Sequence, residues 1–280
     1  MSHVAVVSDS VCSIPQNLMD SLDIKMVPVR FMLGDKEYRD IIDITGDVFF
    51  RRMREEGLLP TTSASPMGEF LQIFQELRGK VDGVVAFAIP PELPSGCYDA
   101  AKRAAALVPD MKIEVVDSRW TILAHGFVVL AGARAAAQGA DVATVARVAR
   151  ETSSKMNLLF TPGPLKYFRR LGRFLLPGTE EDWAKLCPIL TMKGGRIALE
   201  ESCSSERGIP RMIELVKERV KKNSPLHLGV FHAGDPAKAE EIKKEILADV
   251  RCDELVENSM TPVSGIHTGP GTVGVAFYNE

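Results

Sequence analysis

Residues 81–89, VDGVVAFAI, form a near-continuous apolar run of strand length that ends at Pro90. A strand without alternation of polar and apolar side chains is expected where both faces of a parallel sheet are covered by helices. The loop that follows, PPELPSG, leads into a predicted helix from about Cys97 to Leu107. This succession of strand, loop and helix predicts an α/β fold for the surrounding chain.

Two further apolar runs of strand length flank this unit. Residues 4–7 lead into the polar triplet SDS at positions 8–10, and residues 113–117 are followed by an Ala-rich helix. Strands that alternate with helices in this way predict a doubly wound, mostly parallel sheet in residues 1–157. Ligands bind at the carboxyl ends of the strands in such sheets, which makes Asp9 a candidate. Bracing of the loop is nevertheless the role that we favour for Asp9.

The second half of the chain changes pattern from about residue 157. Residues 187–199, CPILTMKGGRIAL, predict a β-hairpin on a Gly194-Gly195 turn, and two further strands are predicted before the last residue. Since a hairpin pairs its strands antiparallel, we expect residues 158–280 to form an α+β domain with a mixed or antiparallel sheet. The predicted fold class is therefore α/β with two domains, which agrees with a length of 280 residues.

Composition and charge exclude several classes of protein. Hydrophobic residues make up 45% of the chain and charged residues 25%, which indicates a globular protein with a sizeable core. The net charge is −3 and the basic residues are scattered, so no nucleic-acid partner is expected. The first residues, MSHVAVVSDS, lack a basic region followed by a long apolar segment, which disfavours secretion. The apolar run near residue 130 is interrupted by His125, Gly126 and Arg134, which disfavours a membrane span.

The cysteines and the search for known catalytic motifs give no indication of a disulfide, a metal site or a catalytic site. Five cysteines without a CxxC pair predict neither a disulfide framework nor a zinc site, and favour the reducing cytoplasm. No carboxylate or cysteine lies at ligand spacing around His227 and His232, so no metal site is predicted. A dinucleotide fingerprint, a P-loop and a GxSxG elbow are all absent from the sequence. We therefore expect a binding protein and not an enzyme.

Hydroxyl side chains gather at two predicted helix starts. Residues 60–70, PTTSASPMGEF, place four of them before a helix start at Pro66. Since Pro is tolerated at the first helical position, Ser65 is the predicted N-cap. The N–H groups of the first turn and the hydroxyls around them could then bind one acidic head group, and Ser95 stands at the second helix start. An ordinary capped loop explains the same residues, and local sequence alone favours that explanation.

Seven short motifs occur in order along the chain: Val6-Val-Ser-Asp-Ser, Pro60-Thr-Thr-Ser, Ser95-Gly-Cys-Tyr, Val116-Asp-Ser-Arg, Leu171-Gly-Arg, Cys187-Pro-Ile-Leu and His267-Thr-Gly-Pro-Gly. Together they resemble the DegV family of bacterial fatty-acid-binding proteins, and the match covers essentially the whole chain. The resemblance implies a cleft between two domains that holds one long-chain fatty acid of the palmitate, stearate or oleate type. It further implies no cofactor, and in some members a separate acyl kinase that receives the bound acid for phospholipid synthesis.

The resemblance also implies roles for individual residues. Thr62 matches the threonine that binds the carboxylate, Ser95 matches the serine of a Ser-Gly-Thr segment, and His267 matches the histidine near the head group. Arg173 matches the arginine of a Gly-Gly-Arg turn close to the cleft. The full predicted ligand-binding set is Thr62, Ser63, Ser95, Arg173, His267 and Thr268, with no catalytic or metal-binding residue.

This chain departs from the family pattern at several positions. Ala64-Ser65-Pro66 stands where Gln-Pro-Ser is usual, and Pro90-Pro91 stands where a Ser-Ser pair is usual. Pro94 is an apparent insertion, Cys97 replaces a threonine, and Cys203 replaces a frequent basic residue. The altered second loop favours one alternative, and the two-domain cleft with the Asp-Ser strand ends favours another. One is a binder of another apolar carboxylate, and the other is an enzyme acting on a phosphorylated or acylated small molecule through Asp9 or His267.

Overall fold

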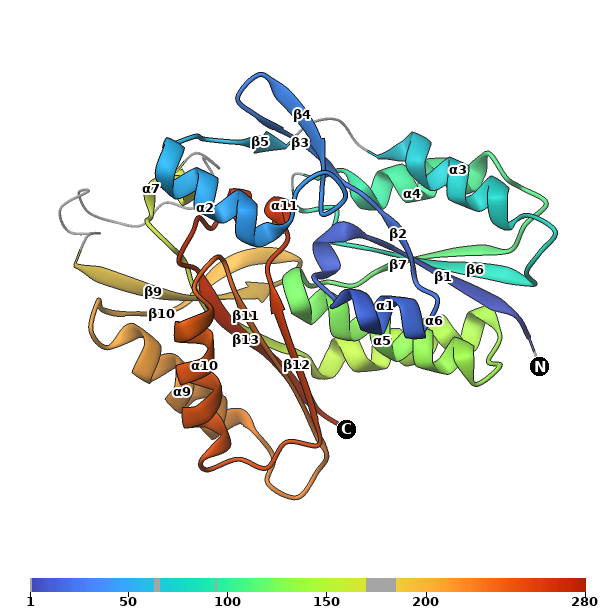
Figure 1. Ribbon diagram of the computed structural model, residues 1–280. Helices are drawn as coiled ribbons and strands as arrows, with labels where there is room; N and C mark the ends of the chain where they lie inside the picture. The colour runs from blue at the N-terminus through green and yellow to red at the C-terminus, as the bar shows by residue number, and fades with distance from the viewer. Residues whose placement is uncertain (1, 63–65, 94, 170–184) are drawn as a thin grey trace.

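The computed structural model of the protein describes residues 2–62, 66–93, 95–169 and 185–280 (Figure 1). Its first sheet has four strands in the order β2-β1-β6-β7, and every neighbouring pair is parallel. The strands are β1 (Val4–Asp9), β2 (Lys25–Val27), β6 (Gly83–Ala88) and β7 (Ile113–Asp117). This arrangement confirms the parallel sheet predicted from the apolar runs.

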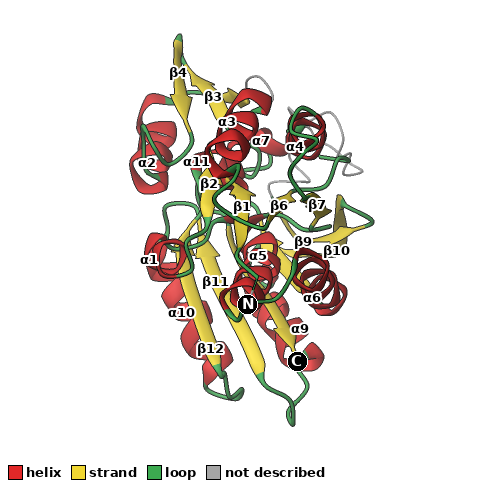
Figure 2. Cartoon of the chain, turned by 90° about the vertical axis from the view of Figure 1, so that its right-hand side faces the viewer, coloured by secondary structure: helices red, strands yellow, loops and turns green. Residues whose placement is uncertain are grey.

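Helices cover both faces of this sheet, and β6 shows why its sequence is continuously apolar. On one face lie α3 (Met67–Leu77) and α4 (Cys97–Ala106), which pack on Val84 and Ala86 (Figure 2). On the other face lie α5 (Ile122–Ala137) and α6 (Val142–Lys155), which pack on Val85 and Phe87. Alternate residues of one strand thus enter two different apolar layers, as in a doubly wound fold.

The second sheet has six strands in the order β10-β9-β8-β13-β11-β12, and only the pair of β11 and β12 is parallel. The strands are β8 (Asn157–Thr161), β9 (Leu186–Lys193), β10 (Arg196–Ser204), β11 (Leu226–His232), β12 (Glu254–Ser259) and β13 (Val273–Asn279). Helices α9 (Gly208–Arg219) and α10 (Pro236–Leu247) cover one of its faces. The predicted mixed sheet and the hairpin on Gly194-Gly195 are both confirmed.

Helix α5 lies between the two sheets and contacts both of them (Figure 1). Its sequence, ILAHGFVVLAGARAAA, is apolar on nearly all sides, which is the expected property of a helix buried all round. Two glycines permit close packing, since a Cβ on Gly126 would lie 2.4 Å from the Cys12 carbonyl oxygen and one on Gly132 would lie 2.5 Å from the Phe87 ring. One continuous apolar cluster contains residues of both sheets. The domain boundary at 157/158 stays a prediction.

A small third sheet was not predicted from the sequence. It has the order β4-β3-β5 and consists of β3 (Arg30–Leu33), β4 (Lys36–Arg39) and β5 (Thr61–Thr62). The sequence predicts one strand over residues 24–33, but that prediction is wrong, because the chain leaves the first sheet after Val27 and enters the small one at Arg30. Pro28 lies between them, and its missing N–H cannot continue a ladder.

The remaining helical elements are short or connect the sheets. They are η1 (Ser10–Cys12), α1 (Gln16–Ser21), α2 (Gly46–Glu56), α7 (Lys166–Arg169) and α11 (Pro262–Ile266). Helix α3 begins at Met67 with Pro66 in the N-cap position and no side-chain cap, so the helix starts one residue later than predicted. The predicted N-cap, Ser65, lies outside the described residues. Within the described ranges, no helix is long and apolar enough to cross a membrane.

Candidate functional site

The short helix α11 places His267 beside the small sheet. The helix starts at the N-cap Thr261, whose side-chain hydroxyl accepts a hydrogen bond from the Ser264 N–H, and it ends at His267 in the C-cap position. Helix α11 lies against β5, the strand that carries Thr62. The fold thus holds Thr62 and His267 on neighbouring elements. The two residues are about 200 positions apart in the sequence. Their membership of one ligand-binding site stays a prediction.

Thr268 follows His267 and has an unusual environment. Its side chain is 3% exposed, and its Oγ1 has no hydrogen-bond partner among the described residues. The nearby Thr272 differs, since its Oγ1 donates to the Gly269 carbonyl oxygen at 2.7 Å and accepts from the Gly163 N–H at 3.0 Å. A buried hydroxyl without a partner costs about 1 to 3 kcal/mol. Thr268 Oγ1 therefore fits a ligand that offers an acceptor atom.

Ser95 lies at the start of α4, as predicted. Gly96 takes the N-cap position with a φ of 65°, a left-handed conformation that glycine adopts without strain. The Ser95 hydroxyl oxygen accepts a hydrogen bond from the Cys97 N–H at 3.3 Å. Since a hydroxyl group both accepts and donates, its own hydrogen can still be donated to a carboxylate. The Cys97 thiol is buried, and burial with the nearby Asp9 raises its pKa well above the ordinary value.

Asp9 braces the loops at the carboxyl end of the first sheet. Its side chain is fully buried; Oδ1 accepts from the Val11 N–H at 3.0 Å and Oδ2 accepts from the Ile89 N–H at 2.9 Å. The His125 Nε2 of helix α5 lies 3.5 Å from Asp9 Oδ1 and 3.2 Å from the Ser8 hydroxyl. Because both carboxyl oxygens hold backbone groups of two neighbouring strand ends, the structure favours the bracing role over the role of a nucleophile.

A second buried acid, Asp40, connects the first sheet to α11. Its Oδ2 accepts from the Ser10 hydroxyl at 2.6 Å and its Oδ1 accepts from the Val263 N–H at 3.1 Å. Burial raises the pKa of Asp40 to about 7, against the opposing effect of these hydrogen bonds and with a smaller contribution from Asp9. Asp40 thus fixes the helix that positions His267 against the loop after β1. Sequence reasoning missed this residue, since no motif surrounds it and its partner Val263 is 223 positions away.

Two predicted site residues cannot be placed. Ser63 and Arg173 lie outside the described residues. The other four fall into two groups, with Thr62, His267 and Thr268 around α11 and Ser95 at the start of α4. Besides burial, the buried acids Asp9 and Asp40 both raise the pKa of the Cys97 thiol, two residues after Ser95.

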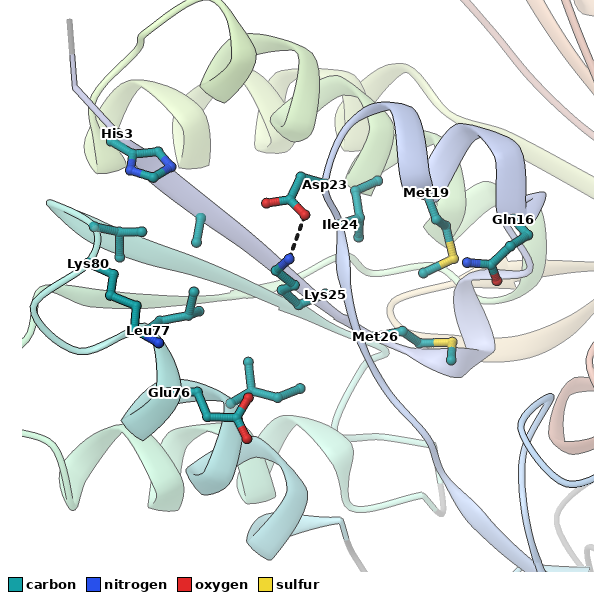
Figure 3. Close-up of a pocket in the computed structure, with 13 residues that line it drawn as sticks. His3, Gln16, Met19, Asp23, Ile24, Lys25, Met26, Glu76, Leu77 and Lys80 are labelled. Carbon is teal, nitrogen blue, oxygen red and sulfur yellow. Dashed lines mark hydrogen bonds and ion pairs between the residues drawn. The ribbon is translucent and has the colours of Figure 1, made fainter.

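One pocket of the molecule lies apart from the predicted ligand-binding residues. It has a volume of about 550 Å³ and lies between α1, the edge strand β2 and α3 (Figure 3). Apolar side chains such as Met19 and Leu77 line it beside the charged Lys25 and Glu76, and none of the predicted ligand-binding residues does. Over the part of the chain that the structure describes, no three His, Cys, Asp or Glu side chains group closely enough to hold a metal ion.

Comparisons with known proteins give one consistent result. The model of a family described as uncharacterised protein, DegV family, matches residues 3–280. A DegV domain-containing protein of Mycobacterium tuberculosis is 31% identical over 283 residues, which cover 97% of this chain and 96% of the relative. The crystal structure of DegV, a fatty acid binding protein from Bacillus subtilis, has a TM-score of 0.89 at 26% identity and covers 100% of both chains. A stearic-acid-binding protein from Eubacterium ventriosum has a TM-score of 0.87 at 25% identity, covering 100% of this chain and 98% of its own.

Proposed function

The chain belongs to the DegV family, and on that premise we propose that it binds one long-chain fatty acid of the palmitate, stearate or oleate type. In this proposal the acyl tail lies in an apolar tunnel between the two predicted domains, and hydroxyl groups with His267 hold the carboxylate. The ligand class is supported by two solved relatives that are described as fatty-acid-binding proteins. We propose a cytoplasmic carrier that needs no cofactor and catalyses no reaction.

The observation that carries the head-group assignment is the buried Thr268 hydroxyl, which has no hydrogen-bond partner in the part of the chain that the structure describes. A carboxylate oxygen would accept its hydrogen, and burial of a carboxylate is tolerable only where several donors meet it. Thr62 on β5 and the Ser95 hydroxyl are the further donors that we assign. Enzymatic use of Asp9 is not favoured, because both of its carboxyl oxygens already accept backbone hydrogen bonds.

The proposal further includes a partner: the bound fatty acid is presented to a separate acyl kinase. Cys203 lies on β10, at the position where the family resemblance implies a basic residue. If a kinase uses that face, this chain must attract it with other charges, and Arg207 and Arg196 are the basic residues nearest to Cys203 in the sequence.

Protein purified from cells should carry an added mass in the fatty-acid range in native mass spectrometry, and delipidated protein should take up oleate or palmitate. Thr62→Ala should weaken this binding by about 1 to 3 kcal/mol, since it removes one donor to a buried carboxylate. Thr61→Ala is the matched control, because Thr61 is the exposed neighbour on the same strand. A folded wild-type protein that never binds either acid would refute the function, whereas equal affinities of both variants would refute only the head-group position.

Thr268→Val should separate ligand binding from stability. Valine has the shape of threonine without the hydroxyl, so the ligand-free variant should be at least as stable as the wild type in thermal unfolding. Its affinity for oleate should nevertheless fall by about 1 to 3 kcal/mol. Thr272→Val is the control, since it removes a hydroxyl that makes three hydrogen bonds and should lower the stability of the ligand-free protein. Unchanged oleate affinity in Thr268→Val would contradict the assignment.

A further inference from the structure

Two cysteines face each other across the β9–β10 hairpin. In the register of the pair, Cys203 lies directly opposite Cys187. Directly opposite residues of antiparallel strands have Cα atoms about 4.5 to 5.5 Å apart and point to the same side of the sheet. Disulfides span Cα separations of about 4.4 to 6.8 Å. The backbone of this hairpin is therefore already in a position that a disulfide can bridge.

The surroundings of the two thiols support this placement. A Cβ on Gly208, the first residue of α9, would lie 2.2 Å from Cys187 Sγ, so Cys187 points toward α9. Cys203 packs against the apolar cluster that α9 and α10 form on the sheet, so it points to the same side. Both cysteines are half-buried, and both thiols are free. Burial raises the pKa of Cys187, and the neighbouring Cys203 raises it further.

We propose that Cys187 and Cys203 form a reversible intramolecular disulfide when the protein meets a low-molecular-weight disulfide. One cysteine, as the thiolate, attacks a sulfur of the reagent RSSR, which forms a mixed disulfide and releases RS⁻. The second thiolate then attacks the protein sulfur of the mixed disulfide and expels the second RS⁻. The two cysteines lose two electrons and two protons in total, and the reagent is reduced to two RSH. This thiol site is independent of the proposed fatty-acid binding.

The cross-link would restrain the hairpin next to the proposed head-group site. The tip of the hairpin lies against the loop that precedes Ser95, since a Cβ on Gly195 would lie 2.6 Å from Glu92 Oε2 and 3.1 Å from Pro90 Cβ. A bond between Cys187 and Cys203 would join the two strands near the other end of the same hairpin. The disulfide would therefore cross-link the hairpin whose tip contacts the loop before Ser95.

The test uses the full, reduced protein and glutathione disulfide as the reagent. After exposure, remaining thiols are alkylated and the protein is digested with trypsin without reductant. Trypsin cuts after Lys193 and Arg196, between the two cysteines, so only a disulfide can hold the two peptides together. We expect this linked pair, the loss of two of the five thiols, and a faster reaction at higher pH, because both thiols must ionise first.

Single variants identify the partners. Cys187→Ser and Cys203→Ser should each stop at a mixed disulfide and gain the mass of one glutathione. Cys252→Ser is the matched control, because Cys252 is also half-buried and free, and this variant should form the same linked peptides as the wild type. The proposal is overturned if the wild-type protein keeps all its thiols, ends with glutathione still attached to either cysteine, or links a different pair.

Discussion

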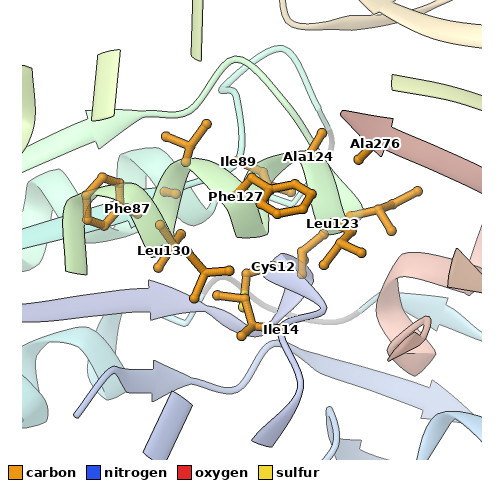
Figure 4. Packing of buried hydrophobic residues seen from close by; sticks show 14 of the residues in the cluster. Cys12, Ile14, Phe87, Ile89, Leu123, Ala124, Phe127, Leu130 and Ala276 are labelled. Carbon is orange, nitrogen blue, oxygen red and sulfur yellow. The ribbon is translucent and has the colours of Figure 1, made fainter. Parts of the chain in front are cut away.

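Replacement of Phe127 by alanine should lower the free energy of unfolding by about 3 to 5 kcal/mol, the usual cost of removing a buried aromatic ring. Phe127 has no exposed surface and lies on α5, where it meets the second sheet (Figure 4). Its ring packs edge-on against Tyr278 of β13, with centroids 5.7 Å apart, and a Cβ on Gly229 of β11 would come within 2.8 Å of it. The cavity would open between the two sheets. Urea unfolding followed by circular dichroism measures the loss.

The size of the cavity can be varied to check this cause. Phe127→Leu keeps most of the apolar volume and should cost clearly less than Phe127→Ala. Leu107→Ala serves as the surface control, because Leu107 is 58% exposed and its truncation should change stability by less than about 0.5 kcal/mol. Equal midpoints for Phe127→Ala and the wild type would contradict the packing described for α5.

Asp9→Ala should lower the free energy of unfolding by about 2 to 6 kcal/mol. The substitution leaves the buried N–H groups of Val11 and Ile89 without acceptors, and each such loss costs about 1 to 3 kcal/mol. These two groups belong to the ends of two neighbouring strands of the first sheet, so the loops around Ser95 should also lose order. Urea unfolding gives the stability, and hydrogen exchange of the Ile89 amide gives the local effect.

Asp9→Asn is the matched variant for this prediction. Its side-chain carbonyl can still accept one of the two hydrogen bonds, so the loss should be smaller than in Asp9→Ala. An Asp9→Ala protein with wild-type stability would show that water or a rearranged loop replaces the carboxyl group.

The sequence predicts the central elements of the fold because their signals are local. The apolar runs at residues 4–7, 81–89 and 113–117 all correspond to strands of the first sheet. Strand β5 of the small sheet was missed because it is only two residues long and pairs with β3, which lies about 30 residues earlier in the chain. Pairing of that kind leaves no periodic pattern for local reasoning to detect.

The candidate site is predictable only in part for a similar reason. Ser95 and its helix start can be recognised from local residue types, and the structure confirms the start of α4 at Cys97. Asp40 could not be recognised, because its burial arises only when α11 is brought against it by the completed fold. That the Thr268 hydroxyl is buried without a hydrogen-bond partner among the described residues is likewise a property of the tertiary environment.

Helix α5 has a consequence for how this protein can change over evolution. By sequence it belongs to the first half of the chain, yet part of its surface packs against the second sheet. A Cβ on Gly229 would lie within 3 Å of both Leu123 and Phe127, so a larger residue at that strand position requires smaller ones on the helix. We therefore expect that the first or second half of the chain cannot readily be exchanged for that of a relative. We also expect these three positions to vary together.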